Sequence, residues 1–256
     1  MKEFFSKLNT ALKDIFFPLR YTCSACGKEI FDDEQFCDEC EKSVRLITEN
    51  KCLKCGRETL YAKGECSSCS HETAVDLSRS VFSYEGAIKS VIHKLKYSSA
   101  RYLADMLAPY LKNVYIENFF APDIITFVPM SIKAEEKRGY NQSELLADAL
   151  AKLLSLEAYC TLEKVKDTAR QAELDFEERS KNLKGAFKVT DKKFVKGKRV
   201  LVVDDVLTTG ATSHEVASAL KTAGVKSGYL LTGASVSREK KAKKRGKRRN
   251  SLKKSL

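Results

Sequence analysis

No stretch of this sequence is apolar over the roughly 18 residues that a membrane-spanning helix requires. The N-terminal segment also lacks the pattern of a secretory signal peptide, because Lys13, Asp14 and Pro18 interrupt its apolar positions. A chain without an export signal is expected to act in the reducing cytoplasm, where disulfide bonds are rare. We therefore expect a cytoplasmic protein with few or no disulfides.

The two glycine-rich motifs that hold nucleotides are absent as well. The chain contains neither Gly-x4-Gly-Lys nor Gly-x-Gly-x2-Gly, and this disfavours an ATP-binding or dinucleotide-binding fold. Any anion site must therefore be built in another way.

The net charge outside the C-terminus is small, although the formal net charge of the chain is +12. Residues 238–256 hold eleven Lys or Arg and one Glu, a local +10 that leaves only +2 for the preceding 237 residues. So basic a segment, with almost nothing apolar, cannot form a core and is expected to be disordered. It either binds polyanions in a salt-dependent way or serves as a solubility extension.

Composition and periodicity divide the chain into four segments. They are an amphipathic helix (1–19), a cysteine-rich module (20–72), an α/β domain (79–236) and the disordered basic tail (237–256). The apolar face of the first favours packing on the body of the protein, with a membrane-surface helix as the alternative.

In the α/β domain, apolar runs typical of buried strands alternate with stretches of helical periodicity. Strands are expected within 80–84, 123–129, 199–205 and 227–235, and helices around 88–95, over 141–154 and over 213–224. Unbroken Val, Leu and Ile runs alternating with helices predict a mostly parallel sheet that is covered on both faces.

Eight of the nine cysteines form two copies of one pattern, 29 residues apart. In each copy, two Cys-x2-Cys pairs are separated by ten residues, and each pair can direct two thiolates at one point about 2.3 Å away. Four such ligands leave no open position, so the pattern predicts structural zinc that supplies folding energy to a segment with a thin core. The copies could interleave, one could have lost its metal, and disulfides are the remaining alternative. The predicted ligands are Cys23, Cys26, Cys37, Cys40, Cys52, Cys55, Cys66 and Cys69. The ninth cysteine, Cys160, stands in an apolar stretch and is expected to be a buried thiol.

Residues 200–212, VLVVDDVLTTGAT, run from a strand through a Thr- and Gly-containing turn into a helix. Backbone N–H groups at such a helix N-terminus, together with the helix dipole, bind phosphate without any lysine. The hydroxyls of Thr208, Thr209 and Thr212 add donors, and Gly210 allows the main chain to approach a ligand closely. The turn therefore predicts an anion site.

Two acids, Asp204 and Asp205, precede this turn. Ionised carboxylates accept hydrogen bonds and donate none, so the hydroxyl groups of a sugar are suitable partners. A sugar phosphate would satisfy both features, because its charged end and its hydroxyls are different parts of one molecule. The alternatives are a metal-binding acid pair and a simple capping box formed by Thr212 and Glu215.

The segment 200–212 resembles the phosphoribosyl diphosphate (PRPP) motif of type I phosphoribosyltransferases, and the wider pattern resembles the ComF (competence) family. The tandem cysteine pairs support this resemblance, which spans about residue 15 to residue 235. Further supporting segments are YEGAIKSVIHKLKY (84–97), VPMS with KRGYNQSELLA (128–147) and DTARQAELDFEERSKNLKGAF (167–187).

The resemblance implies a type I phosphoribosyltransferase fold, with PRPP at the strand ends and Mg²⁺ bridging its diphosphate. The implied catalytic carboxylates on the ribose are Asp204 and Asp205. The other implied PRPP-binding residues are Val206, Leu207, Thr208, Thr209, Gly210, Ala211, Thr212, Pro129, Met130, Ser131, Arg138 and Lys96, with Lys94 as a further diphosphate partner. The segment 167–187 would close over the site and contains Arg170, Gln171, Arg179 and Asn182.

The resemblance also implies a function in DNA uptake and natural transformation, with phosphoribosyl transfer to an unidentified acceptor and release of diphosphate. Expected partners are PRPP, single-stranded DNA, and DNA-uptake or recombination-mediator proteins. One alternative is a non-catalytic nucleic-acid-binding scaffold with a PRPP-sensing domain, and another is a nucleobase salvage enzyme. Replacing Asp205 by Asn is expected to abolish PRPP binding without affecting the fold, because a ribose contact is lost without a change in volume.

Overall fold

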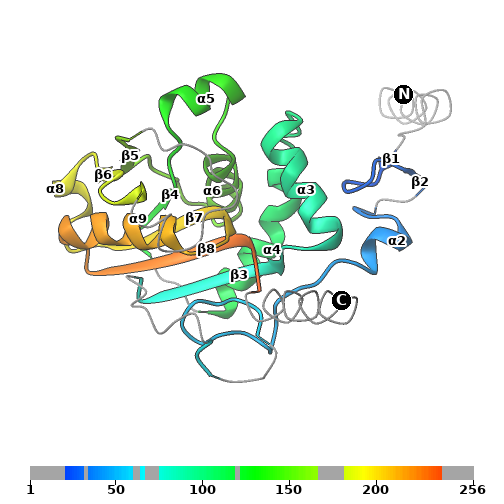
Figure 1. The fold of residues 1–256 in the computed structure, drawn as a ribbon, viewed down its shortest axis with the longest axis horizontal. Coiled ribbons are helices and arrows are strands. Elements are labelled where there is room, and N and C mark those ends of the chain that lie inside the picture. Colours follow the sequence, from blue (N-terminus) through cyan, green and yellow to red (C-terminus); the bar gives the residue numbers. More distant parts are fainter. Residues whose placement is uncertain are drawn as a thin grey trace, which may run out of the picture.

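The computed structural model describes residues 21–31, 34–59, 64–66, 75–118, 122–166 and 182–237. Its centre is a four-stranded sheet with the order β3-β8-β7-β4, in which every neighbouring pair of strands is parallel (Figure 1). The strands are β3 (Leu77–Ser83), β4 (Ile124–Phe127), β7 (Arg199–Leu207) and β8 (Ser227–Ser235). The parallel sheet predicted from the apolar runs is confirmed.

Helices cover both faces of this sheet, as neighbouring residues of β7 show. Leu201 and Val203 pack into a core with α3 (Gly86–Tyr97), α4 (Leu103–Glu117) and α6 (Gln142–Leu153). Val200 and Val202 pack into a second core with α9 (Ala211–Thr222). Successive side chains of a strand point to opposite faces, so the unbroken Val/Leu run of β7 is buried from both sides.

Shorter elements surround the sheet. A two-stranded antiparallel hairpin, β5 with β6, lies between α6 and β7 in the sequence. The bounds are α5 (Ile132–Arg138), β5 (Leu162–Lys164), β6 (Phe187–Val189) and α8 (Lys192–Val195). Among the described residues, no helix has the length and apolar character needed to cross a membrane.

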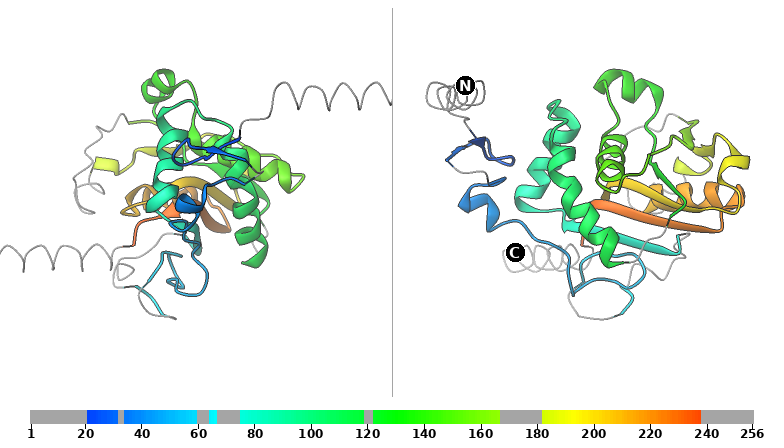
Figure 2. Two further views of the ribbon diagram at one scale, coloured as in Figure 1. Left: turned by 90° about the vertical axis from the view of Figure 1, so that its right-hand side faces the viewer. Right: turned by 180° about the vertical axis from the view of Figure 1, so that it is seen from behind.

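The two cysteine-rich segments lie at separate places on the α/β domain, the first beside α3 and the second next to β3 (Figures 1 and 2). The first contains β1 (Tyr21–Thr22), β2 (Glu29–Ile30) and α2 (Asp38–Glu41). Lys94 of α3 donates a hydrogen bond to the Ser24 carbonyl at 3.1 Å, so this lysine holds the first segment.

The connection between the two cysteine-rich segments runs along the outer edge of β3. The Ile47 amide donates to the Val81 carbonyl at 2.8 Å, and the Ser83 amide donates to the Arg45 carbonyl at 2.9 Å. An unpaired edge strand exposes a row of backbone donors and acceptors that invites aggregation. The connection satisfies part of that row on β3.

The second segment packs directly on the backbone of β3. Gly56 has φ +66°, and a Cβ atom at this position would lie 2.4 Å from the Ser78 carbonyl oxygen. Ser78 Oγ donates to the Cys55 carbonyl at 3.1 Å, and Arg79 Nη1 donates to the Leu53 carbonyl at 3.1 Å. The expected N-terminal helix (1–19) and the tail beyond residue 237 lie outside the described residues.

Candidate functional site

The acid pair lies at the carboxyl end of β7, in the middle of the sheet. Asp204 Oδ1 accepts a hydrogen bond from Ser143 Oγ at 2.8 Å and another from the Asp205 backbone N–H at 2.9 Å. Ser143 belongs to the first turn of α6, whose N-cap Asn141 accepts from the Ser143 amide at 3.0 Å. The N-terminus of α6 therefore fixes the Asp204 carboxyl group in one orientation.

Asp205 is 4% exposed and is paired with Lys96 of α3. Lys96 Nζ lies 2.5 Å from Asp205 Oδ2, and the lysine side chain is itself only 21% exposed. A buried charge is costly unless an opposite charge accompanies it. Although burial by itself would lower the pKa of Lys96, Asp205 and Asp204 raise it above its ordinary value. The lysine is therefore the partner of Asp205.

Burial, with the Asp205 charge as the second cause, raises the pKa of Asp204 to about 7. A carboxyl group whose pKa is raised in the folded state binds more protons there than in the unfolded chain. Its effect on stability is therefore most favourable in acid and is lost as the pH rises from its ordinary pKa towards 7. Near neutral pH, the Asp204 carboxyl group accordingly lowers the free energy of unfolding, a cost that a functional site can tolerate.

Replacing Asp204 by Asn should therefore raise the melting temperature by a few degrees near pH 8, with a gain that shrinks towards pH 4. The amide side chain introduced by this change would keep an oxygen that can accept from Ser143. Thermal unfolding followed by circular dichroism across this pH range measures the effect. Asp123→Asn is the control and should lower the melting temperature near pH 8. Hydrogen bonds from Arg199 lower the pKa of Asp123 to about 2, so this carboxylate stabilises the folded state when it is ionised. A lower melting temperature for Asp204→Asn near pH 8 would contradict the assignment.

The turn after β7 leads directly into α9. Gly210, the N-cap residue, has φ +90°, a left-handed conformation that favours glycine. Gly210 has no side chain with which to cap α9, and the first helical amide, that of Ala211, donates to Thr209 Oγ1 at 3.4 Å. Glu215 instead accepts from the Gly185 backbone N–H at 2.9 Å, so the Thr212–Glu215 capping box is not formed. The end of the helix dipole is thus available to an anion.

A second loop, residues 128–131, lies beside the acid pair because β4 and β7 are parallel neighbours. The Val128 amide donates to the Val203 carbonyl at 3.1 Å. Arg138 Nη1 lies 3.5 Å from Met130 Sδ, and its guanidinium carbon lies 5.2 Å from the centre of the Tyr97 ring. Arg138 therefore lies alongside this loop.

The structure brings most of the sequence-predicted site residues to one end of the sheet. Val206, Leu207 and Ala211 are buried, so only their backbones can face a ligand. Pro129, Met130, Thr209 and Thr212 are half-buried, Ser131 is buried and Thr208 is exposed. Asn182 is exposed, and the other three residues named for the closing segment (Arg170, Gln171 and Arg179) lie outside the described residues.

Sequence analysis did not identify Ser143 as a site residue. It stands two positions after Asn141, inside the segment VPMS…KRGYNQSELLA that supported the family resemblance. Its position at the N-terminus of the predicted helix over 141–154 was the available signal, since such positions lie at the carboxyl ends of parallel strands.

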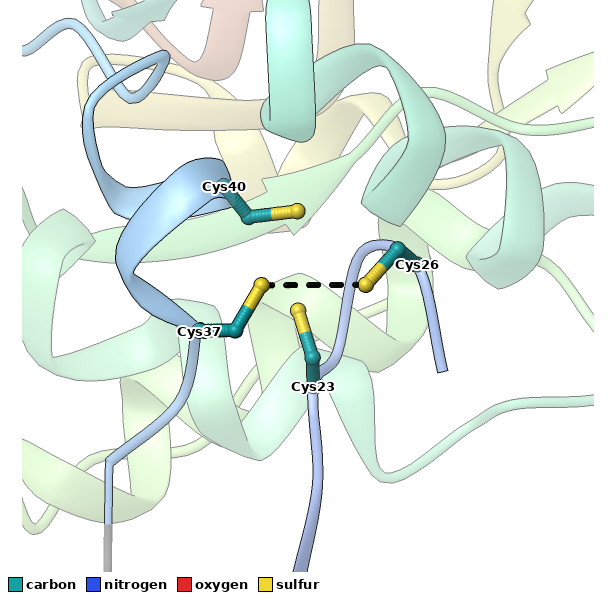
Figure 3. Close-up of side chains that lie close together, drawn as sticks. All are labelled: Cys23, Cys26, Cys37 and Cys40. Carbon is teal, nitrogen blue, oxygen red and sulfur yellow. Dashed lines mark hydrogen bonds between the residues drawn. The ribbon is translucent and has the colours of Figure 1, made fainter. Parts of the chain in front are cut away.

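The first cysteine cluster has the geometry of a tetrahedral metal site (Figure 3). The sulfur atoms of Cys23, Cys26, Cys37 and Cys40 all lie within 4.8 Å of one another, and the Cys26 and Cys37 sulfurs are 3.8 Å apart. A tetrahedron with Zn–S bonds of about 2.3 Å has edges of about 3.8 Å. The four thiols therefore fit a closed, structural zinc site.

The second cluster contains Cys52, Cys55 and Cys66, again within 4.8 Å of one another, with 3.7 Å between the Cys55 and Cys66 sulfurs. Cys69, its fourth predicted ligand, lies outside the described residues. The Cys52 sulfur accepts from the backbone N–H groups of Cys55 at 3.5 Å and Cys66 at 3.3 Å, which favours the thiolate that metals bind. The pairs are thus grouped in sequence order and do not interleave.

The expectation that Cys160 is a buried thiol is wrong. Its side chain is exposed, because it lies in the loop that precedes β5 and not within a strand. Among the described cysteines, it is also the one that belongs to neither cluster.

Two family models match parts of the chain. A family model described as a double zinc ribbon domain matches residues 12–70, and one described as a phosphoribosyl transferase domain matches residues 141–253. The DNA utilization protein YhgH of Salmonella typhimurium is 31% identical over 191 residues, which cover 72% of this chain and 83% of that protein. Competence protein F of Haemophilus influenzae is 29% identical over 197 residues, covering 74% and 85% respectively.

Among solved structures, glutamine PRPP amidotransferase from B. subtilis aligns with a TM-score of 0.38 and 21% identity. The alignment covers 54% of this chain and 30% of that one. A similarity of this size carries no further argument about the present chain.

Proposed function

Because the chain belongs to the family of competence protein F and the DNA utilization protein YhgH, we propose that it binds PRPP and transfers its phosphoribosyl group to an acceptor during the handling of incoming DNA. The observation that carries the proposal is the continuity of the site. The acid pair, the turn with Gly210 and the start of α9 follow one another without a break at the centre of a parallel sheet. Ligands of such sheets bind beyond the carboxyl ends of the strands.

In this proposal each part of the site holds a different part of PRPP. The amides and hydroxyls of residues 208–212 hold the 5′-phosphate at the positive end of α9. Asp204, oriented by Ser143 at 2.8 Å, accepts a hydrogen bond from a ribose hydroxyl. The 128–131 loop, with Arg138 alongside it, receives the diphosphate.

The chemistry follows from the charges. As diphosphate leaves, the ribose C1 carbon becomes positive, and a carboxylate beside the ring stabilises that charge. Carboxylate oxygens such as those of Asp204 suit Mg²⁺, which when bound neutralises charge on the departing diphosphate. Lys96 Nζ, 2.5 Å from Asp205 Oδ2, compensates for the burial of this carboxylate, and in the proposal both acids face the sugar as acceptors.

The binding part of the proposal is tested by a methyl group at Gly210. We expect Gly210→Ala to weaken PRPP binding at least tenfold, because the new Cβ would stand at the start of the anion site, 3.2 Å from Arg57 Nη2. Gly197→Ala is the matched control: Gly197 also has a positive φ, +73°, but a Cβ there meets nothing within 4 Å. Both changes should cost about 1–2 kcal/mol of stability. Isothermal titration calorimetry with PRPP and Mg²⁺ separates them, and equal affinities would contradict the proposal.

The catalytic part is tested by the release of diphosphate from PRPP. Release is expected with single-stranded DNA, or a component of it, as the acceptor, and not with free nucleobases. PRPP binding without release in the presence of any acceptor would favour the non-catalytic scaffold. Release with a nucleobase alone would favour a salvage enzyme.

A further inference from the structure

Arg57 is the second residue after Cys55 in the second cysteine cluster, and it is only 5% exposed. Its Nε atom is buried and has no hydrogen-bond partner among the described residues. A buried guanidinium N–H without an acceptor costs more than an ordinary lost hydrogen bond, because the group is charged. Such an arrangement is expected where an anionic ligand completes the hydrogen bonding.

The guanidinium of Arg57 points at the turn that begins α9. A Cβ atom at Gly210 would lie 3.2 Å from Arg57 Nη2, closer than to any other group outside its chain neighbours. A side chain at position 210 would therefore crowd the arginine. Gly210 is the residue at which the backbone must approach a phosphate in the proposed function.

Two contacts of the second cysteine segment hold Arg57 in this position. The Arg57 carbonyl accepts from the Cys52 amide at 2.8 Å. The preceding residue, Gly56, lies so close to β3 that a Cβ would be 2.4 Å from the Ser78 carbonyl oxygen. The arginine is thus anchored from the cysteine cluster on one side and from the sheet on the other.

We propose that Arg57 is the cationic ligand of the phosphate monoester held at residues 208–212, so that the second cysteine segment completes the binding site of the α/β domain. This inference rests on the proposed function, since it assumes that a sugar 5′-phosphate binds there. A guanidinium presents a planar fork of donors that matches phosphate oxygens. The turn itself contains no lysine or arginine, and Arg57 supplies the missing charge from a distant part of the sequence.

A competing role for Arg57 is to balance the negative charge of the thiolates of Cys52, Cys55 and Cys66. The two roles differ in what they predict for ligands. If Arg57 balances the charge of the cluster, its replacement would affect zinc retention and leave phosphate affinity unchanged. If Arg57 binds the phosphate, its replacement would weaken the binding of only those molecules that carry the 5′-phosphate.

The experiment compares Arg57→Gln with Arg45→Gln in the full chain, by calorimetry with Mg²⁺ and each of PRPP, ribose 5-phosphate and inorganic diphosphate. Arg45 belongs to the same cysteine-rich region, but its side chain is 61% exposed and pairs with Glu85 at 3.4 Å. We expect Arg57→Gln to weaken the binding of ribose 5-phosphate and of PRPP about tenfold or more. Diphosphate should bind within about twofold of wild type, and Arg45→Gln should bind all three ligands within about twofold of wild type.

Each other outcome has a defined meaning. If the wild-type protein binds PRPP and Arg57→Gln binds ribose 5-phosphate equally well, the inference fails and the proposed function stands. If affinity for all three ligands falls equally, the effect is general and the inference also fails. If the wild-type protein binds neither PRPP nor ribose 5-phosphate, both fail together.

Zinc content and melting temperature show whether Arg57→Gln is folded. If it is not, Arg57→Lys takes its place, because a lysine keeps the charge and loses the fork. For Arg57→Lys we expect the affinity for ribose 5-phosphate to fall several-fold and the affinity for diphosphate to remain unchanged. Wild-type affinity for ribose 5-phosphate in this variant would overturn the proposal.

Discussion

Asparagine at position 205 is expected to remove detectable PRPP binding and to lower the free energy of unfolding by about 3–5 kcal/mol. The first effect follows from the proposed function, because an amide is a poorer acceptor for a ribose hydroxyl than a carboxylate. The second follows from Lys96, whose partly buried charge would lose the carboxylate that lies 2.5 Å from it. The sequence alone predicts the first effect with an unaffected fold, because it does not show that Lys96 and Asp205 are in contact.

The two effects can be separated with a double variant. Lys96→Met combined with Asp205→Asn removes the uncompensated charge and keeps a side chain of similar volume. Stability should therefore return to within about 1–2 kcal/mol of wild type, while PRPP binding should remain absent. Denaturant unfolding and calorimetry measure the two quantities. A double variant as unstable as Asp205→Asn, or one that binds PRPP, would show that the ion pair or the ribose contact is assigned incorrectly.

Local patterns in the sequence predicted the central strands and the helices that bear on the site. The expected strand over 227–235 is β8 residue for residue, and the helix expected over 213–224 overlaps α9. Both elements could be predicted from local features. The strand is an unbroken apolar run, and the helix is followed by a glycine, Gly224, with φ +83°. Such features need no knowledge of the tertiary structure.

Helix α4 was not predicted, although its buried residues Leu103, Leu107 and Leu111 stand at helical spacing. Pro109 lies inside this helix, and proline is the least favourable residue in a helix interior. Packing against α6 and the sheet outweighs that local cost. The helix is an example of tertiary contacts deciding what local preference does not.

The pairings at the site depend on contacts between distant parts of the chain. Lys96 and Asp205 come from α3 and β7, and Arg57 reaches Gly210 from the cysteine-rich segment. In the sequence, Lys96 is one of many lysines and Arg57 is one residue beside a zinc motif. Their burial and orientation distinguish them, and only the folded structure supplies these. Lys96 and Asp205 could be named in advance as site residues, but their pairing could not, and Arg57 and Ser143 were not named at all.

Loss of the second cysteine cluster is expected to disrupt more than the cluster itself. In a Cys55→Ser variant, zinc should fall by about one ion per chain, and the protein should unfold at much lower temperature or aggregate. Structural zinc sites contribute about 10–16 kcal/mol in isolated zinc-binding peptides. Ser78 and Arg79 of β3 hold the backbone of this segment, so its release would also expose the outer edge of the sheet.

Cys160→Ser is the matched control, because Cys160 is exposed and stands apart from both clusters. It should leave zinc content and melting temperature unchanged. Metal analysis, thermal unfolding and light scattering of the two variants provide the comparison. A Cys55→Ser protein with full zinc content and wild-type melting temperature would mean that the cluster does not hold the segment on β3. Arg57 would then need another anchor, because its position against Gly210 depends on the same segment remaining in place.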